Sequence, residues 1–221
     1  MPKDYGIGAS SKRREDVRFL TGRGVYTDDM ALHGQTYAVF VRSTVAHGRI
    51  KSINAKAAEA MPGVLAVFTG EDFKDVGGNP AGWLIKSRNG EPMREPKRPV
   101  LAHGKVRHVG DAYAAVVAET YQQAKDAAQQ LADDTDIEEL PAVTNPVDAL
   151  KPGAPRIHEE APGNLVLDFH YGDAEAVKKA FAEAAHVTRL EIDSQRIVVN
   201  AMEPRSAIGS YDTGKDRWVL N

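Results

Sequence analysis

Residues 112–139 read AYAAVVAETYQQAKDAAQQLADDTDIEE and contain a complete strand-helix-strand pattern. Residues 112–118 form a continuous apolar run, which is typical of a strand covered on both faces. Thr120 is a residue type that caps helices, and the alanine-rich segment 121–131 follows it. Residues 135–139 then return to a short strand. This order predicts parallel strands joined by a crossover helix.

The same order occurs once before in the chain. Residues 35–42 (QTYAVFVR) are rich in aromatic and β-branched residues and predict a strand. Asn54 is positioned to cap a short helix over 55–61, which Pro62 and Gly63 end, and residues 64–68 predict the next strand. The repeat predicts an α/β domain over about residues 34–140, in which a sheet joins 37–42 to 112–118 and both helices pack against it.

Residues 76–99 separate the two units and are crowded with glycine, proline, asparagine and charge. A loop of this length inside a compact domain is usually functional or a docking surface. Trp83 and Leu84 within it either anchor a partner or pack onto the core of their own domain, and the sequence favours neither.

The proline-rich segment 145–164 has no periodicity and indicates a linker. Five short elements are predicted after it: strands at 165–171, 187–192, 197–200 and 207–211, and a helix over 174–184 capped by Asp173. A turn at 212–215 then leads into a strand at 218–220. Because the sequence stops within that strand pattern, we expect another surface to cover it.

The stretch IVVNAMEPRSAIGSY (residues 197–211) contains an unusual bend. Pro204 lacks a backbone donor and biases Glu203 toward an extended conformation. The bend is therefore expected to hold the Glu203 carboxylate and the Arg205 guanidinium in fixed directions. The alternative is an ordinary surface turn with a weak ion pair.

Composition narrows the classes of function. The chain has 221 residues, of which 42% are hydrophobic and 27% charged, as in one large or two ordinary globular domains. A net charge of -3 argues against nucleic acid as the main partner. The absence of cysteine excludes disulfides and iron-sulfur clusters held by this chain. No apolar run approaches the ~20 residues of a membrane span and no signal core is present, which predicts a cytoplasmic protein.

The side chains provide no catalytic or metal-binding pattern. The seven histidines show no helical pair beside a carboxylate, and the closest two, His103 and His108, are not predicted to share a metal. Neighbouring acids on an extended chain point in opposite directions. A serine nucleophile motif is also absent.

Five segments, in order, resemble the opening of one family of large subunits. They are FLTGRGVYTDDM (19–30), YAVFVRSTVAHGRIKSINAKAAEAMPGVLAVFTGEDF (37–73), VRHVGDAYAAVVAET (106–120), EELPAV (138–143) and AMEPRSAIGSYD (201–212). The family is that of the molybdenum-binding subunits of xanthine dehydrogenase, aldehyde oxidase and carbon monoxide dehydrogenase. The resemblance implies an extended arm (1–17), an α/β hammerhead domain of α+β type (18–146), a linker (147–164) and the incomplete start of a second α+β domain, which binds molybdopterin (165–221).

The resemblance also implies a reaction, namely oxidative hydroxylation of a carbonyl or heteroaromatic carbon with water as the oxygen source. Electrons would leave through iron-sulfur clusters and FAD on partner chains or domains. The family's catalytic residues are expected beyond residue 221, so no catalytic or metal-binding residue is predicted here. Glu203 and Arg205 are the candidates nearest to the cofactor, with a structural role.

We therefore expect a scaffold segment that binds no molybdenum, iron or flavin alone and is inactive alone. Its expected partners are the rest of the large subunit, the iron-sulfur and FAD subunits and, through its last strand, a second copy of itself. The alternative is a stand-alone assembly or interaction module with a hammerhead fold and no cofactor.

Overall fold

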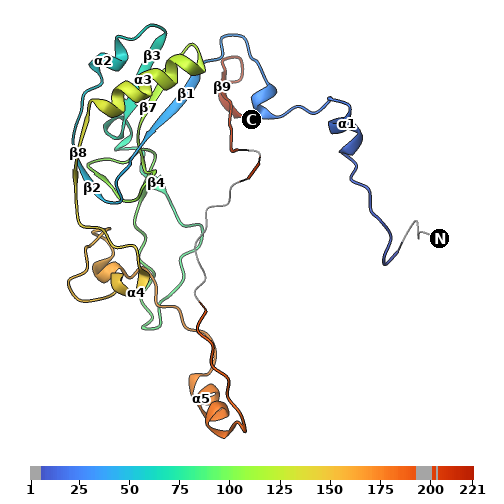
Figure 1. Cartoon of the computed structure of the whole chain (residues 1–221), viewed down its shortest axis with the longest axis vertical. Coiled ribbons are helices and arrows are strands. Elements are labelled where there is room, and N and C mark those ends of the chain that lie inside the picture. The colour runs from blue at the N-terminus through green and yellow to red at the C-terminus, as the bar shows by residue number, and fades with distance from the viewer. Residues whose placement is uncertain (1–5, 193–200, 203) are drawn as a thin grey trace. The chain divides into compact units, whose positions relative to one another are not determined.

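The computed structural model describes residues 6–192, 201–202 and 204–221 (Figure 1). The chain divides into two compact units. One is the continuous segment Thr36–Thr188, and the other combines Met1–Gln35 with Arg189–Asn221.

The larger unit is built on two three-stranded sheets. In the first, β7 (Ala112–Ala118) lies between β1 (Tyr37–Arg42) and β3 (Val64–Thr69). In the second, β2 (Gly48–Ile53) lies between β6 (Lys105–Val106) and β8 (Thr135–Glu139). The predicted sheet that joins residues 37–42 to 112–118 is confirmed by the β1–β7 pairing.

The predicted parallel pairing is wrong, because every pairing in both sheets is antiparallel. The physical reason is β2, a strand that the sequence pattern did not predict. Helix α2 (Lys56–Glu59) joins β2 to β3, and helix α3 (Tyr121–Asp133) joins β7 to β8. Each helix thus connects two different sheets instead of two neighbours in one sheet.

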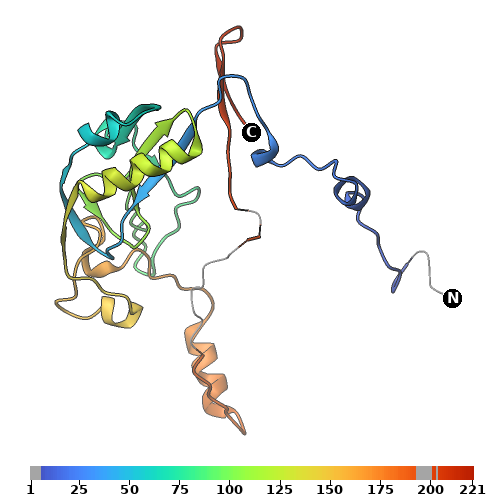
Figure 2. The same cartoon turned by 45° about the horizontal axis from the view of Figure 1, so that its top comes forward.

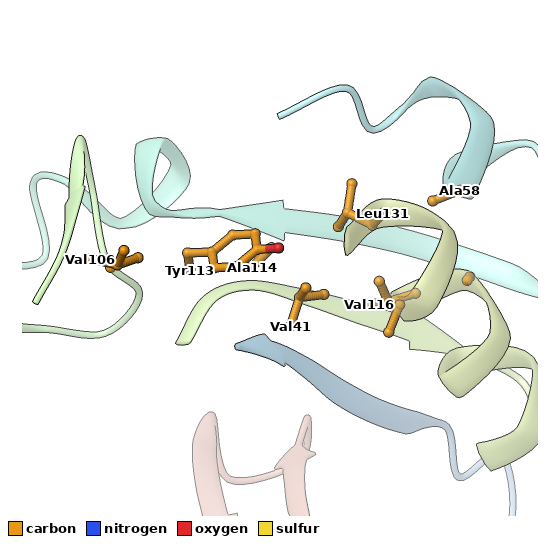
Figure 3. Packing of buried hydrophobic residues seen from close by; sticks show 10 residues of the cluster. Val41, Ala58, Val106, Tyr113, Ala114, Val116 and Leu131 are labelled. Atoms are coloured by element: carbon orange, nitrogen blue, oxygen red, sulfur yellow. The ribbon is translucent and has the colours of Figure 1, made fainter. Parts of the chain in front are cut away.

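Helix α3 lies across one face of the first sheet (Figure 2). Its buried face is made of small side chains and one leucine, namely Ala124, Ala127, Ala128 and Leu131. Alanines at this spacing share one side of a helix and let the backbone approach the strands closely. Figure 3 shows Leu131 in one cluster with Val41 of β1, Val116 of β7 and Ala58 of α2.

Both helices predicted between residues 34 and 140 are present, but only one starts as predicted. Helix α3 begins as predicted, since the Thr120 hydroxyl accepts a hydrogen bond from the Gln123 backbone N–H at 3.3 Å. Helix α2 is shorter than predicted and is preceded by Ala55 without a side-chain cap, so the Asn54 cap is wrong.

We expect Thr120→Ala to lower the free energy of unfolding by about 1 kcal/mol, because it leaves a helix N–H without its capping oxygen. Chemical denaturation followed by circular dichroism measures the change. Thr120→Ser keeps the oxygen and is the matched control. Equal losses in the two variants would show that the hydroxyl does not stabilise the helix start.

The remaining elements of the larger unit are short. They are the 3₁₀ helices Gly70–Phe73 (η2) and Pro162–Asn164 (η3), the strand pair Gly78–Asn79 (β4) and Arg98–Pro99 (β5), and the helices Pro146–Ala149 (α4) and Ala174–Glu183 (α5). Helix α5 is capped as predicted, with Asp173 Oδ1 accepting from the Ala176 N–H at 2.9 Å. Residues 165–171 and 187–192 are not strands, so both of these predictions are wrong.

The smaller unit contains helix α1 (Asp16–Leu20), the 3₁₀ helix Thr27–Asp29 (η1) and the hairpin of β9 (Gly209–Asp212) with β10 (Arg217–Leu220). The predicted turn at 212–215 is confirmed between these strands. The predicted strand at 197–200 lies outside the described residues. No helix in the described part of the chain is long and apolar enough to cross a membrane.

Candidate functional site

The two site candidates from the sequence lie just before β9. Glu203 is outside the described residues, and Arg205 is an exposed residue without regular secondary structure. The predicted fixed geometry between this carboxylate and this guanidinium therefore stays a prediction.

The hairpin after Arg205 is held by local contacts. Asp212 Oδ1 accepts hydrogen bonds from the backbone N–H groups of Gly214 and Lys215, both at 3.1 Å. The rings of Tyr211 and Trp218 lie 5.0 Å apart. The Tyr211 hydroxyl donates to Asp216, and this hydrogen bond raises the pKa of Tyr211. Trp218 is nevertheless 79% exposed, so the hairpin presents an aromatic side chain to its surroundings.

His103 and His108, the closest histidine pair in sequence, have separate partners. His103 Nε2 lies 2.7 Å from a Glu71 carboxylate oxygen, and His108 Nε2 lies 3.8 Å from Asp111 Oδ1. Hydrogen bonds from Lys74 and then from His103 lower the pKa of Glu71. Among the described residues, no three His, Asp or Glu side chains are placed to hold a metal ion. That this pair does not share a metal stays a prediction.

His47 has a structural role that the sequence did not reveal. The side chain is 5% exposed, and its Nδ1 lies 2.8 Å from the carbonyl oxygen of Pro141, to which it donates. The His47 carbonyl accepts from the Leu140 N–H at 2.9 Å. Because the partners are 94 positions apart, no local pattern could have indicated the contact. The side chain fixes the segment that follows β8.

The loop 76–99 docks residues 165–168 of its own chain. The backbone N–H groups of Arg88 and Arg94 donate to the carbonyl oxygens of Asp168 and Val166 at 2.7 and 2.9 Å. The Arg88 guanidinium also lies 3.4 Å from the Asp168 carboxylate. These bonds hold residues 165–168, which pair with no strand. One role of the loop is therefore to bind this later segment of the same unit.

Trp83 lies in the same loop and is 81% exposed, while Leu84 is 50% exposed. Neither packs into the core, so the structure disfavours that alternative. The exposed indole is a contact surface that this unit leaves uncovered.

Two family models match the chain in succession. The first, described as aldehyde oxidase and xanthine dehydrogenase, a/b hammerhead domain, matches residues 21–134, which is more than half of the chain. The chain belongs to the aldehyde oxidase and xanthine dehydrogenase family. The second, a molybdopterin cofactor-binding domain, matches residues 157–221. The resemblance recognised in the sequence is thereby confirmed.

Individual relatives agree with this assignment. The large subunit of nicotine 6-hydroxylase from Paenarthrobacter nicotinovorans is 35% identical over 97% of this chain and 25% of that protein. The carbon monoxide dehydrogenase large chain of Afipia carboxidovorans is 33% identical over 99% of this chain and 27% of that protein. The crystal structure of quinoline 2-oxidoreductase from Pseudomonas putida 86 superposes with a TM-score of 0.82 at 35% identity, covering 100% of this chain and 27% of that one.

The chain thus spans about a quarter of the length of the relatives it matches and corresponds to the N-terminal part of molybdenum hydroxylase large subunits. The α/β fold with a hammerhead domain is confirmed by the same matches. The names of these relatives describe subunits of multi-subunit enzymes, and the second family model implies molybdopterin in the complete enzyme.

The second family match ends on residues 201–221, whose described side chains include no buried one. Every described residue between 201 and 221 is exposed or half-buried. A cofactor the size of a pterin needs a concave site that buries most of its surface. No step of the reaction can therefore be assigned to the side chains described here.

Proposed function

We propose that this chain provides the hammerhead domain and the first part of the molybdopterin-binding region of a molybdenum hydroxylase large subunit. The observation that carries the proposal is the ordered pair of family matches, at 21–134 and 157–221, on a chain that spans a quarter of its relatives. In this role the chain is a scaffold. It forms one side of the substrate funnel and binds the other subunits.

The complete enzyme would oxidise a carbonyl or heteroaromatic carbon, with molybdopterin supplying the redox centre when bound. Iron-sulfur clusters would be carried by other domains or chains, since this chain has no cysteine, and FAD would also lie on partners. Glu203 and Arg205 remain our candidates for residues near the cofactor. We also keep the cytoplasmic location and the domain boundaries 1–17, 18–146, 147–164 and 165–221 as predictions.

Purification of the tagged chain from its native cells tests this proposal. We expect the protein that co-purifies to contain molybdenum, iron and flavin, as measured by elemental analysis and absorption spectroscopy. The matched control is the same chain produced alone, which should contain none of them in stoichiometric amount. Recovery from native cells of a partner without molybdenum would instead support the stand-alone interaction module.

Hydrogen exchange should divide the chain into a protected and an unprotected part. Among the described residues, all buried side chains lie between Val41 and Ala161, and none from 162 onward is buried. Helix α5 exposes Val177 (54%) and Phe181 (61%). Segments with few buried contacts open at low free energy, so we expect slow exchange in β7 and α3 and early exchange in α5 and the β9–β10 hairpin.

The exposed apolar groups also predict self-association of the isolated chain as its concentration rises. Sedimentation velocity over a concentration series measures it. A strictly monomeric chain with uniform protection would show that the C-terminal region completes its own core, which contradicts the scaffold role.

A further inference from the structure

A cavity of about 960 Å³ lies inside the larger unit, between the loop 79–99 and residues 107–111, His158 and Val166. We call it the basic pocket. Four of its lining side chains carry positive charge, namely Arg94, Lys97, Arg98 and Arg107, and two carry negative charge, Glu95 and Asp111. The charged side chains therefore leave two positive charges at neutral pH.

Both carboxylates already have backbone partners. Glu95 accepts a hydrogen bond from the Ala81 N–H, and Asp111 Oδ2 accepts from the Arg107 N–H at 2.9 Å. Their role is to hold the walls of the pocket in place. In the part of the chain that the structure describes, neither carboxylate lies within 4.0 Å of the charged group of any of the four cations.

Some cations elsewhere in the unit do lie beside a carboxylate. Lys105, for example, lies 2.8 Å from the Glu159 carboxylate, and Arg88 lies 3.4 Å from Asp168. The four pocket cations form no such pair within 6–192, 201–202 and 204–221. Arg94, Lys97 and Arg98 are exposed, so solvent partly screens the repulsion among the four cations, and a bound anion relieves what remains.

Arg107 is held in position before any ligand arrives. Its Nε donates to the Ile157 carbonyl at 3.2 Å, and its Nη1 lies 3.4 Å from the Lys105 carbonyl. A guanidinium with five N–H donors keeps further donors for an oxyanion. Because the group is already ordered, little conformational entropy remains to be lost on binding.

His158 lies among charges of both signs and is partly buried. Burial lowers the pKa of its imidazole most, and the charge of Arg107 lowers this pKa further; Arg98 acts in the same direction, while Glu160 and Asp111 oppose it. The ring is therefore neutral at pH 7 and can share a hydrogen bond with a ligand.

We propose that the basic pocket binds a small molecule that carries phosphate groups, such as a phosphate ester or a diphosphate. A dianion matches the excess of two positive charges among the lining side chains. Three of the four cations are arginines, whose planar groups bind phosphate oxygens in pairs. The volume falls at the upper end of the range for small-molecule sites, which leaves room for an organic group beside the phosphate.

Isothermal titration calorimetry of the full chain with inorganic pyrophosphate at low ionic strength tests the proposal. We expect saturable binding that Lys97→Gln and Arg98→Gln each weaken about tenfold, because each removes one charge-assisted contact. Lys125→Gln, which removes an exposed charge on α3, is the control and should change the affinity by less than about twofold. Thermal unfolding of each variant verifies that it is folded.

Imidazole resonances in NMR locate the binding. A bound anion stabilises the imidazolium, so pyrophosphate should raise the pKa of His158. Citrate and a hexaglutamate peptide are the comparison ligands. Absence of pyrophosphate binding, a His158 pKa that does not move, citrate binding as tight as pyrophosphate, or binding of the peptide alone would each overturn the proposal.

Discussion

Replacing Leu131 with alanine is expected to lower the free energy of unfolding by about 3–4 kcal/mol. The Leu131 side chain is fully buried and lies in the cluster that joins α3 to the first sheet. Its neighbours include Ala58, whose side chain is too small to fill the cavity that the substitution leaves. The loss therefore combines the lost burial of the removed carbon groups with an uncollapsed cavity.

Urea denaturation followed by fluorescence and circular dichroism measures this loss. Leu65→Ala is the matched control, since Leu65 lies on β3 of the same sheet and is 54% exposed. We expect it to cost less than about 1 kcal/mol. If the two substitutions cost the same, α3 does not pack on the sheet as described.

The helices and the central strand could be predicted because their signals are local. The Thr120 and Asp173 side chains accept hydrogen bonds from backbone N–H groups three positions ahead. Each helix start is therefore determined by a few neighbouring residues. The apolar run of β7 reflects its central place between two strands and beneath a helix.

The pairing of the strands could not be predicted in the same way. Strand β2 reads GRIKSI, and only its two isoleucines are strongly apolar. What makes it a strand is its partner, since Ile50 is paired with Ile137 of β8, far along the chain. Contacts of that kind depend on the assembled sheet and not on the propensity of six residues.

The prediction of a strand at residues 165–171 was wrong for the opposite reason. Its composition favours a strand, but its backbone bonds go to Arg88 and Arg94 of an irregular loop. The basic pocket is likewise assembled from loop residues around 94–98, 107–111 and 158, which no spacing rule connects. Sequence could reveal the family of the chain and most of its helices, whereas sites made by loop packing needed the structure.

The second large effect is expected at Gly70, where η2 begins. A Cβ at this position would lie 2.3 Å from the carbonyl oxygen of Ala102 and 2.8 Å from its carbonyl carbon. The Ala102 backbone cannot retreat freely, since its N–H donates to the Ala112 carbonyl of β7 at 2.7 Å. We therefore expect Gly70→Ala to lower the free energy of unfolding by about 3 kcal/mol, although it adds a single methyl group.

Gly82→Ala is the matched control for this substitution. A Cβ on Gly82 would have no heavy atom within 4 Å, and the residue has no positive φ, so alanine should change stability by less than about 0.5 kcal/mol. Urea denaturation measures the free energy of unfolding of both variants. Each variant adds one methyl group, at Gly70 beside a backbone carbonyl and at Gly82 in open space. Equal stability of the two variants would mean that residues 102–103 lie farther from η2 in solution than in this structure.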